Sequence, residues 1–220
     1  MSLPASILFV GAHCDDIELF AGATLSRALR EGVRVGVLVF SDHRGVVDAA
    51  RAERAREEFR ENLSWLSRET SRPIDDHTTD WLTACHGAFE TERGKIYAAL
   101  DALRDRYACV ITHPSTDTNQ DHQQVSLEAR RVFKAHATLL GGEFPSNDLG
   151  EFSAQYFVPV GEIDVATKVQ MVQRYESQQF GDRPYFSEKA VAGLLYARGA
   201  QVRAPAAEAF EVLGRVISRP

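Results

Sequence analysis

The chain has 220 residues, of which 44% are hydrophobic and 25% are charged, and its formal net charge at pH 7 is −6. This length and composition predict one globular domain, spanning residues 1–220 and long enough to bury a substantial core. The acidic balance and the lack of any long Lys/Arg run argue against a nucleic-acid partner.

The cysteines and the apolar segments indicate the compartment. Cys14, Cys85 and Cys109 are an odd number at unrelated spacings, which argues against a disulfide framework and favours a reducing environment. The apolar run near the N-terminus has no basic segment before it and is broken by His13 and Asp15, so no signal peptide is expected. No apolar run reaches transmembrane length. We therefore expect a cytoplasmic protein without a membrane span, and the sequence leaves open whether it is a monomer or a homo-oligomer.

Up to residue 137, short apolar runs alternate with segments of helical periodicity. The pattern predicts buried strands at 6–11, 33–40 and 108–112, a short strand plus loop at 73–81, and helices at 16–30, 48–68, 91–107 and 123–136. When a helix connects two successive strands of one sheet, those two strands are expected to be parallel. The sequence therefore predicts an α/β fold, with a Rossmann-like, mostly parallel sheet and helices on both faces.

The rest of the chain should extend the sheet and build the wall of a substrate site. It contains a polar loop at 141–150, a strand at 154–160, and helices at 163–175 and 187–198. Phe210, Leu213 and Val216 have the spacing of an amphipathic face, which predicts a helix over 206–217.

Three metal-competent side chains follow the first predicted strand. His13, Asp15 and Asp16 lie where that strand ends and the helix begins. In open α/β sheets, ligands bind outside the carboxyl ends of the strands. An alternative is that Asp15 or Asp16 only caps the helix, because Asp is favoured at helix N-termini.

A second polar segment follows the strand at 108–112. It supplies Asp117, Asp121 and His122 just before a helix, at the same edge of the sheet as His13. Two imidazoles and one carboxylate, with a fourth position left to water, describe a catalytic Zn²⁺ site, which Fe²⁺ or Mn²⁺ could also occupy. A further carboxylate near the metal can accept a proton as metal-bound water attacks.

Together, the two segments resemble the LmbE-like, PIG-L family of zinc-dependent N-acetylglucosaminyl de-N-acetylases. The family's Ala-His-Pro-Asp-Asp-Ile-Glu and Asp-x-His-x-Asp-His segments correspond here to Ala12-His13-Cys14-Asp15-Asp16-Ile17-Glu18 and Asp117-Thr118-Asn119-Gln120-Asp121-His122.

This resemblance implies an LmbE-like fold and a hydrolase that removes an N-acetyl or similar N-acyl group from a small amino-sugar conjugate. It also implies that His13, Asp16 and His122 bind zinc and that Asp15 is the general base. Asp121 would orient an imidazole or hold a proton.

The sequence departs from the family at two positions. Cys14 replaces Pro, and we expect it to be a buried, packed thiol rather than a ligand. Asn119 replaces a His that, in many members, is thought to polarise the carbonyl or protonate the leaving amine. Asn119 can donate a hydrogen bond to a developing oxyanion, but it cannot act as a general acid. The proton donor to the leaving amine is therefore left open.

Arg54 and His113 are candidate substrate-binding residues. Arg54 could bind a phosphate or a carboxylate, although a solvated helix charge is the alternative. His113 follows a strand end and could line the pocket, or it could be an ordinary loop residue. His43 and His86 lie in predicted loops, and the sequence suggests no partner for either.

Two other functions compete with the deacetylase. One is a non-catalytic ligand-binding module of the same fold that keeps its metal, which the replacement at Asn119 would allow. Asp15 argues against it, because a binding protein needs no base beside the metal. The other is a phosphoesterase with two metals about 4 Å apart, but the carboxylates for a second ion are not evident.

Overall fold

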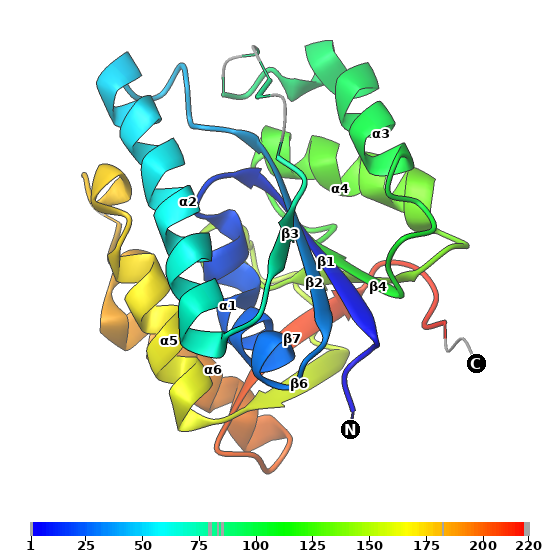
Figure 1. Cartoon of the computed structure of the whole chain (residues 1–220), viewed down its shortest axis with the longest axis vertical. Coiled ribbons are helices and arrows are strands. Elements are labelled where there is room, and N and C mark those ends of the chain that lie inside the picture. The colour runs from blue at the N-terminus through cyan, green and yellow to red at the C-terminus, as the bar shows by residue number, and fades with distance from the viewer. Residues whose placement is uncertain (1, 79–80, 83, 85, 182, 218–220) are drawn as a thin grey trace.

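One sheet runs through the part of the chain that this computed structural model describes, namely residues 2–78, 81–82, 84, 86–181 and 183–217. Its seven strands have the order β3-β2-β1-β4-β5-β7-β6 (Figure 1). In chain order they are β1 (Ser6–His13), β2 (Arg34–Ser41), β3 (Ile74–Asp76), β4 (Cys109–Thr112), β5 (Thr138–Gly142), β6 (Tyr156–Val160) and β7 (Ala206–Val212). Strands β1 to β5 pair in parallel, and β7 is antiparallel to both of its neighbours.

Helices cover both faces of this sheet, as predicted. One face carries α1 (Asp16–Arg30), α2 (Ala49–Thr70), α5 (Glu162–Gln173) and α6 (Glu188–Gln201), and the other carries α3 (Arg93–Asp101) and α4 (Gln120–Phe133) (Figure 1). Side chains of β1 alternate between the two cores: Phe9 packs with the first group of helices and Val10 with the second. A strand buried on both faces therefore reads as the continuous apolar run seen in the sequence.

Helix α1 is broken at Ala21, whose φ of −145° and ψ of 17° are not helical. Glu208 of β7 satisfies the backbone after the break by accepting hydrogen bonds from the N–H groups of Ala23 (3.1 Å) and Thr24 (2.6 Å). Lys168 of α5 pairs with the same buried carboxylate at 2.7 Å. Glu208 thus caps the part of α1 that follows the break. The first turn, which carries Asp16, lies before the break.

The helix predicted over 206–217 is wrong, because residues 206–212 form β7. Ala and Glu, which dominate this segment, have high intrinsic helix propensity. The segment nevertheless pairs with both β5 and β6, and this tertiary pairing outweighs the local preference.

Strand β5 was not predicted, since its two glycines suggested a loop. Both are required by close packing: a Cβ on Gly141 would lie 2.6 Å from the Pro114 Cα atom, and one on Gly142 would lie 2.6 Å from the Phe20 ring. Glycine in a strand often marks such an approach.

The other predicted elements are present with shifted ends. The predicted helix over 91–107 is a 3₁₀ turn at Phe89–Glu92 followed by the shorter α3, and α4 begins one turn earlier than predicted. Three more 3₁₀ turns occur, at Pro145–Asn147, Glu176–Gln178 and Pro184–Phe186. Cys85 lies outside the described residues.

Among the residues that the structure describes, no helix combines the length and the apolar character needed to cross a lipid bilayer.

Candidate metal centre

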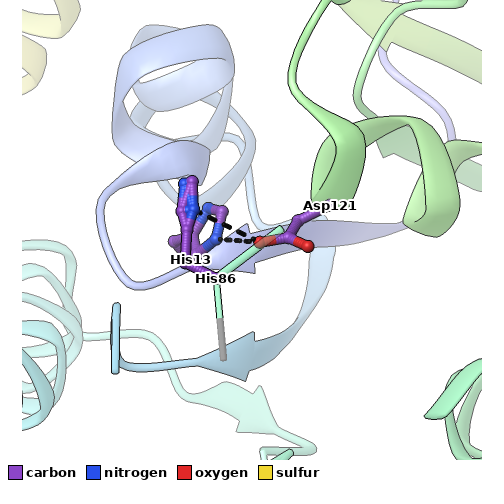
Figure 2. A group of neighbouring side chains, drawn as sticks. All are labelled: His13, His86 and Asp121. Atoms are coloured by element: carbon purple, nitrogen blue, oxygen red, sulfur yellow. Dashed lines mark hydrogen bonds and ion pairs between the residues drawn. The ribbon is translucent and has the colours of Figure 1, made fainter. Parts of the chain in front are cut away.

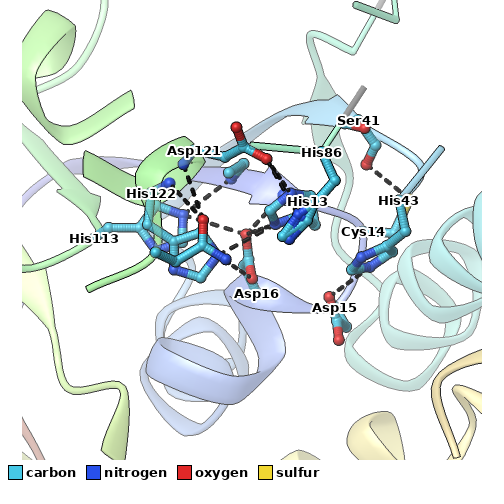
Figure 3. Close-up of polar contacts among 12 residues, drawn as sticks. His13, Cys14, Asp15, Asp16, Ser41, His43, His86, His113, Asp121 and His122 are labelled. Atoms are coloured by element: carbon cyan, nitrogen blue, oxygen red, sulfur yellow. Dashed lines mark hydrogen bonds and ion pairs between the residues drawn. The ribbon is translucent and has the colours of Figure 1, made fainter. Parts of the chain in front are cut away.

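The two polar segments singled out in the sequence meet at the carboxyl edge of the sheet, between β1 and β4. Strand β2 lies on one side of β1 and β4 on the other, so the direction of strand succession changes here, which is where open α/β sheets bind ligands. His13 is the last residue of β1 and Asp16 the first of α1, while His122 lies in the first turn of α4 (Figure 3). The fold therefore brings together side chains more than a hundred residues apart in sequence.

The imidazole of His122 has one ring nitrogen held by a carboxylate and the other directed at the cluster. Its Nδ1 lies 2.7 Å from Asp117 Oδ2, so Nδ1–H donates this hydrogen bond and Nε2 is the nitrogen that faces the cluster. Nε2 lies 3.2 Å from His13 Nδ1 and 3.3 Å from Asp16 Oδ1.

His13 is arranged in the same way with its nitrogens exchanged. Its Nε2 lies 3.2 Å from Asp121 Oδ2, and backbone N–H groups of Gly87 (2.7 Å) and Phe89 (3.3 Å) donate to the same carboxylate. Nδ1 of His13 is left to face Asp16 Oδ2 at 3.4 Å. A carboxylate on the outer nitrogen of each histidine is typical of metal-ligating imidazoles, because it fixes the tautomer and the ring orientation.

The facing atoms of His13, Asp16 and His122 fit a divalent cation. They lie within 4.8 Å of one another, and each residue is only 2% exposed. Two imidazole lone pairs that face each other at 3.2 Å repel unless a positive charge, either a proton or a metal ion, lies between them. A metal ion supplies that charge, and two imidazoles with one carboxylate are the ligands that catalytic zinc prefers.

The electrostatics of the cluster point the same way. Burial lowers the pKa of both imidazoles, but the Asp16 carboxylate and the hydrogen-bonded carboxylates Asp121 and Asp117 outweigh it. They raise the pKa of His13 to about 9 and that of His122 to about 10. Burial raises the pKa of Asp16, yet the surrounding histidines hold that pKa well below its usual range. The site therefore favours net positive charge among these side chains.

Asp15 is the neighbour of Asp16, and its carboxylate contacts His43 rather than the helix backbone. It occupies the N-cap position of α1, but its side chain makes no capping hydrogen bond, and it is 4% exposed. Asp16 Oδ2 accepts instead from the backbone N–H of His13 at 2.6 Å. Neither Asp15 nor Asp16 therefore acts as a side-chain cap of the helix, and this alternative is wrong. Asp15 Oδ1 accepts from His43 Nε2 at 2.9 Å.

His43 lies two residues after the end of β2 and has a strained backbone. Its φ of 65° is in the left-handed region, which costs a non-glycine residue about 1–3 kcal/mol. Its carbonyl accepts from the N–H groups of Val46 (3.1 Å) and Val47 (3.4 Å), and its ring stacks on His13 at 4.7 Å. No sequence pattern pointed to a partner for His43, although its place just after a strand end was an available signal.

His86 reaches the same cluster from the loop before α3 (Figure 2). Its ring centroid lies 4.9 Å from that of His13, and its Nδ1 lies 3.5 Å from Asp121 Oδ2. Together, His13, His86 and Asp121 form a further group with potential ligand atoms within 4.8 Å. No local pattern pointed to His86, because the loop that carries it follows no buried strand directly.

Asn119 and Cys14, the two departures from the family pattern, have defined contacts. Asn119 is the N-cap of α4, and its Oδ1 accepts from the backbone N–H groups of Asp121 (2.9 Å) and His122 (3.3 Å). It therefore holds the turn that carries both residues. Cys14 is fully buried, and its Sγ donates to the carbonyl oxygen of Ser41 at 3.5 Å. Burial raises the pKa of this thiol well above its usual value, in keeping with a packed, neutral side chain.

The two predicted substrate-binding residues have different surroundings. His113 is fully buried, stacks on His122 with ring centroids 3.8 Å apart, and accepts from the Ala12 N–H at 3.0 Å. His113 therefore packs directly against His122, and its contact with substrate stays a prediction. Arg54 pairs with Glu58 on its own helix at 3.1 Å, and its side chain is 43% exposed. Its contact with substrate stays a prediction.

Fold and site together define an α/β protein with a buried His/Asp cluster at the change of strand order. The chain belongs to the PIG-L family, described as GlcNAc-PI de-N-acetylase, whose model matches residues 8–133. It is therefore an enzyme of the deacetylase class, a hydrolase that acts on amide C–N bonds.

Individual relatives are distant. An uncharacterized deacetylase of Escherichia coli (strain K12), YaiS, is 26% identical over 178 residues, which cover 78% of this chain and 90% of YaiS. The N,N'-diacetylchitobiose deacetylase of Pyrococcus horikoshii has a TM-score of 0.68 at 15% identity, covering 94% of this chain and 83% of its own. GalB of Pseudomonas putida, a 4-carboxy-2-hydroxymuconate hydratase, has a TM-score of 0.69 at 15% identity, covering 98% of both chains. Because a hydratase shares this fold, the enzyme class rests on the family match and not on shape.

Proposed function

We propose that the chain, as a single domain over residues 1–220, is a zinc-dependent hydrolase that removes an N-acetyl or similar short N-acyl group from a small amino-sugar conjugate. The observation that carries the proposal is the pair of inward imidazole nitrogens, His13 Nδ1 and His122 Nε2, which face Asp16 at 3.3–3.4 Å. Each has a carboxylate on its outer nitrogen. GlcNAc-PI and diacetylchitobiose, named for the family and for one relative, both contain an N-acetylated amino sugar.

A divalent ion held by His13, Asp16 and His122 would polarise the amide carbonyl and lower the pKa of a water molecule. Asp117 and Asp121 hold the outer N–H groups of the two histidines, so the inner nitrogen of each ring is the one that would bind the ion in place of a proton. Zinc suits this mixed nitrogen and oxygen set, and Fe²⁺ or Mn²⁺ would also be accepted.

Asp15 is the proposed general base. It accepts the proton of the attacking water, and the hydrogen bond from His43 to Oδ1 keeps that carboxylate in place. Asn119 cannot supply a proton to the leaving amine, so we propose that Asp15 returns the one it has accepted. Asn119 instead fixes the turn that carries Asp121 and His122, and its amide N–H group is the candidate donor to the oxyanion.

The buried free thiols of Cys14 and Cys109 fit a reducing compartment, and we propose a cytoplasmic location.

Metal analysis combined with an acetate-release assay tests the proposal. We expect about one zinc per chain, release of acetate from N-acetylglucosamine conjugates, loss of activity in chelator, and recovery on adding zinc. Retained activity after complete removal of metal would refute the metal-dependent mechanism. Stoichiometric metal without acetate release from any N-acetyl sugar would favour the binding module.

The variant Asn119→His separates the enzyme from that binding module. If Asn119 contributes only hydrogen bonds, the variant should keep activity within about tenfold, which is about 1.4 kcal/mol of activation barrier. Acetate release that appears only in the His variant would mean that the natural chain has lost its acid, and would contradict the proposed activity.

A further inference from the structure

A cavity of about 370 Å³ flanks the metal centre on the side of α6. Its walls are mainly apolar and come from Leu19 of α1, Phe144 and Pro145 after β5, Tyr185, and Val191 and Leu194 of α6. This volume is at the lower end of the range of about 300–1,000 Å³ for small-molecule pockets. It is far more space than the methyl group of an acetamide requires.

The cavity lies next to the candidate site, because residues on its wall contact both halves of that site. The Phe144 ring, on its wall, lies 5.1 Å from the His122 ring, and Asn147 in the same loop places its Nδ2 3.3 Å from His122 Nδ1. Leu19 lies one helical turn after Asp15, and its N–H donates to the Asp15 carbonyl oxygen at 3.2 Å. A substrate bound at the metal centre therefore has the cavity directly beside it.

The charged groups on the cavity wall are already paired, so they do not favour an ionic ligand. Glu143 binds Arg198 at 2.8 Å, and Lys168 binds Glu208 at 2.7 Å. A polar or charged ligand group would lose its hydration here without gaining a free partner of opposite charge, whereas an apolar group gains from leaving water.

We infer that this cavity binds an apolar alkyl or aryl substituent of the substrate, carried either on the acyl group or on the glycosidic oxygen. The inference rests on the proposed deacylase function and specifies its substrate class. Each methylene moved from water to an apolar site strengthens binding about fourfold. Because the cavity is open on one side, we expect an octyl group to raise kcat/KM at least about tenfold over a methyl group.

Two pairs of substrates locate the substituent. The first pair is the methyl and octyl β-glycosides of N-acetylglucosamine, and the second is N-acetylglucosamine and N-octanoylglucosamine. An octyl preference within the first pair places the apolar group on the glycosidic oxygen, and one within the second places it on the acyl group. Equal kcat/KM within both pairs would overturn the inference.

Gly193 of α6 allows the cavity to be filled without disturbing the core. It lines the cavity, and a Cβ built on it meets no atom within 4 Å. In Gly193→Leu the octyl-to-methyl ratio should fall toward one. The control Gly94→Leu makes the same change on α3, where a Cβ also meets nothing within 4 Å, and it should keep the wild-type ratio. A ratio unchanged by Gly193→Leu would place the apolar group elsewhere.

A binding measurement keeps this test separate from the deacylase proposal. Octyl β-glucoside has no amide bond, so calorimetric titration of the zinc-loaded protein reports binding alone. We expect measurable binding to the wild type and at least about tenfold weaker binding to Gly193→Leu, with Gly94→Leu unchanged. Binding without acetate release would refute only the deacylase function. Acetate release with no octyl preference and no octyl glucoside binding would refute only the cavity assignment.

Discussion

The candidate metal centre and the neighbouring α6 cavity are built on opposite principles. In the centre, the donor side chains are almost wholly buried, and each is held by at least one further hydrogen bond from a strand end or a helix start. The cavity has a mainly apolar wall. It includes Gly193 of α6, where a Cβ would meet no atom within 4 Å, and it lies beside the loop that follows β5.

Because of this difference, the two regions should tolerate amino-acid substitutions to different degrees. A ligand cluster must hold its geometry within fractions of an ångström, so its supports come from the rigid edge of the sheet. An apolar wall only has to exclude water over an area, so changes there alter preference without destroying the reaction. Substitutions in the centre should therefore affect metal and turnover, and those in the cavity should affect substrate choice.

The largest effect should come from His122→Ala. Removing one of two imidazole ligands should lower bound zinc from about one to below about 0.2 per chain and reduce acetate release to background. His136→Ala, which removes a partly exposed imidazole after the end of α4, is the matched control and should change neither. Full zinc content in His122→Ala would remove this residue from the ligand set.

Asp15→Asn should separate catalysis from metal binding. The amide keeps the size of the side chain but cannot accept the proton, so turnover should fall about 10²–10⁴-fold while zinc content is unchanged. The exposed Asp105→Asn serves as the control. Loss of zinc together with activity would make Asp15 a ligand.

His43→Gly should lower turnover while relieving backbone strain. Loss of the hydrogen bond to Asp15 should reduce kcat about 10–100-fold with little change in KM. Glycine adopts a φ of 65° freely, so the free energy of unfolding should stay within about 1 kcal/mol of wild type.

Two further variants define the role of His43. Ser71→Gly relieves a similar φ of 53° after α2 and should leave kcat unchanged. His43→Gln keeps an N–H donor and should recover part of the loss. Equal kcat in His43→Gly and wild type would show that the contact with Asp15 is only structural.

The smallest effect should come from Cys14→Ala. The thiol is buried against the Ser41 carbonyl and belongs to none of the groups of potential ligand atoms found in the described residues, so zinc content and kcat should be near wild type. Thermal unfolding should show a loss of about 1 kcal/mol from the smaller side chain. A large drop in zinc would instead identify Cys14 as a ligand.

The sequence determined the parallel part of the fold because its signals are local. Residues 6–11 and 33–40 read as buried strands, and the helix between them is the expected connection, so the order of elements followed from periodicity. The two polar segments could be paired in advance for the same reason, since the carboxyl ends of parallel strands share one edge. What followed from the sequence was the position of the candidate site, but not its internal contacts.

Tertiary structure decided the elements whose partners are distant. Ala206–Val212 is a strand because β5 and β6 lie on either side of it, and Gly141 and Gly142 lie in a strand because Pro114 and Phe20 approach them closely. Local propensity favoured a helix and a loop in these places, and neither preference carries information about the neighbours.

Only the folded chain could also place His43 against Asp15, His86 against Asp121, and α6 beside Phe144. These contacts join loops and helices that share no periodicity with the strands, and their geometry depends on how the whole sheet is covered. The residues that can bind a metal therefore lie in two short segments of the sequence. The side chains that orient them, and the cavity beside them, arise from packing between segments far apart in the sequence.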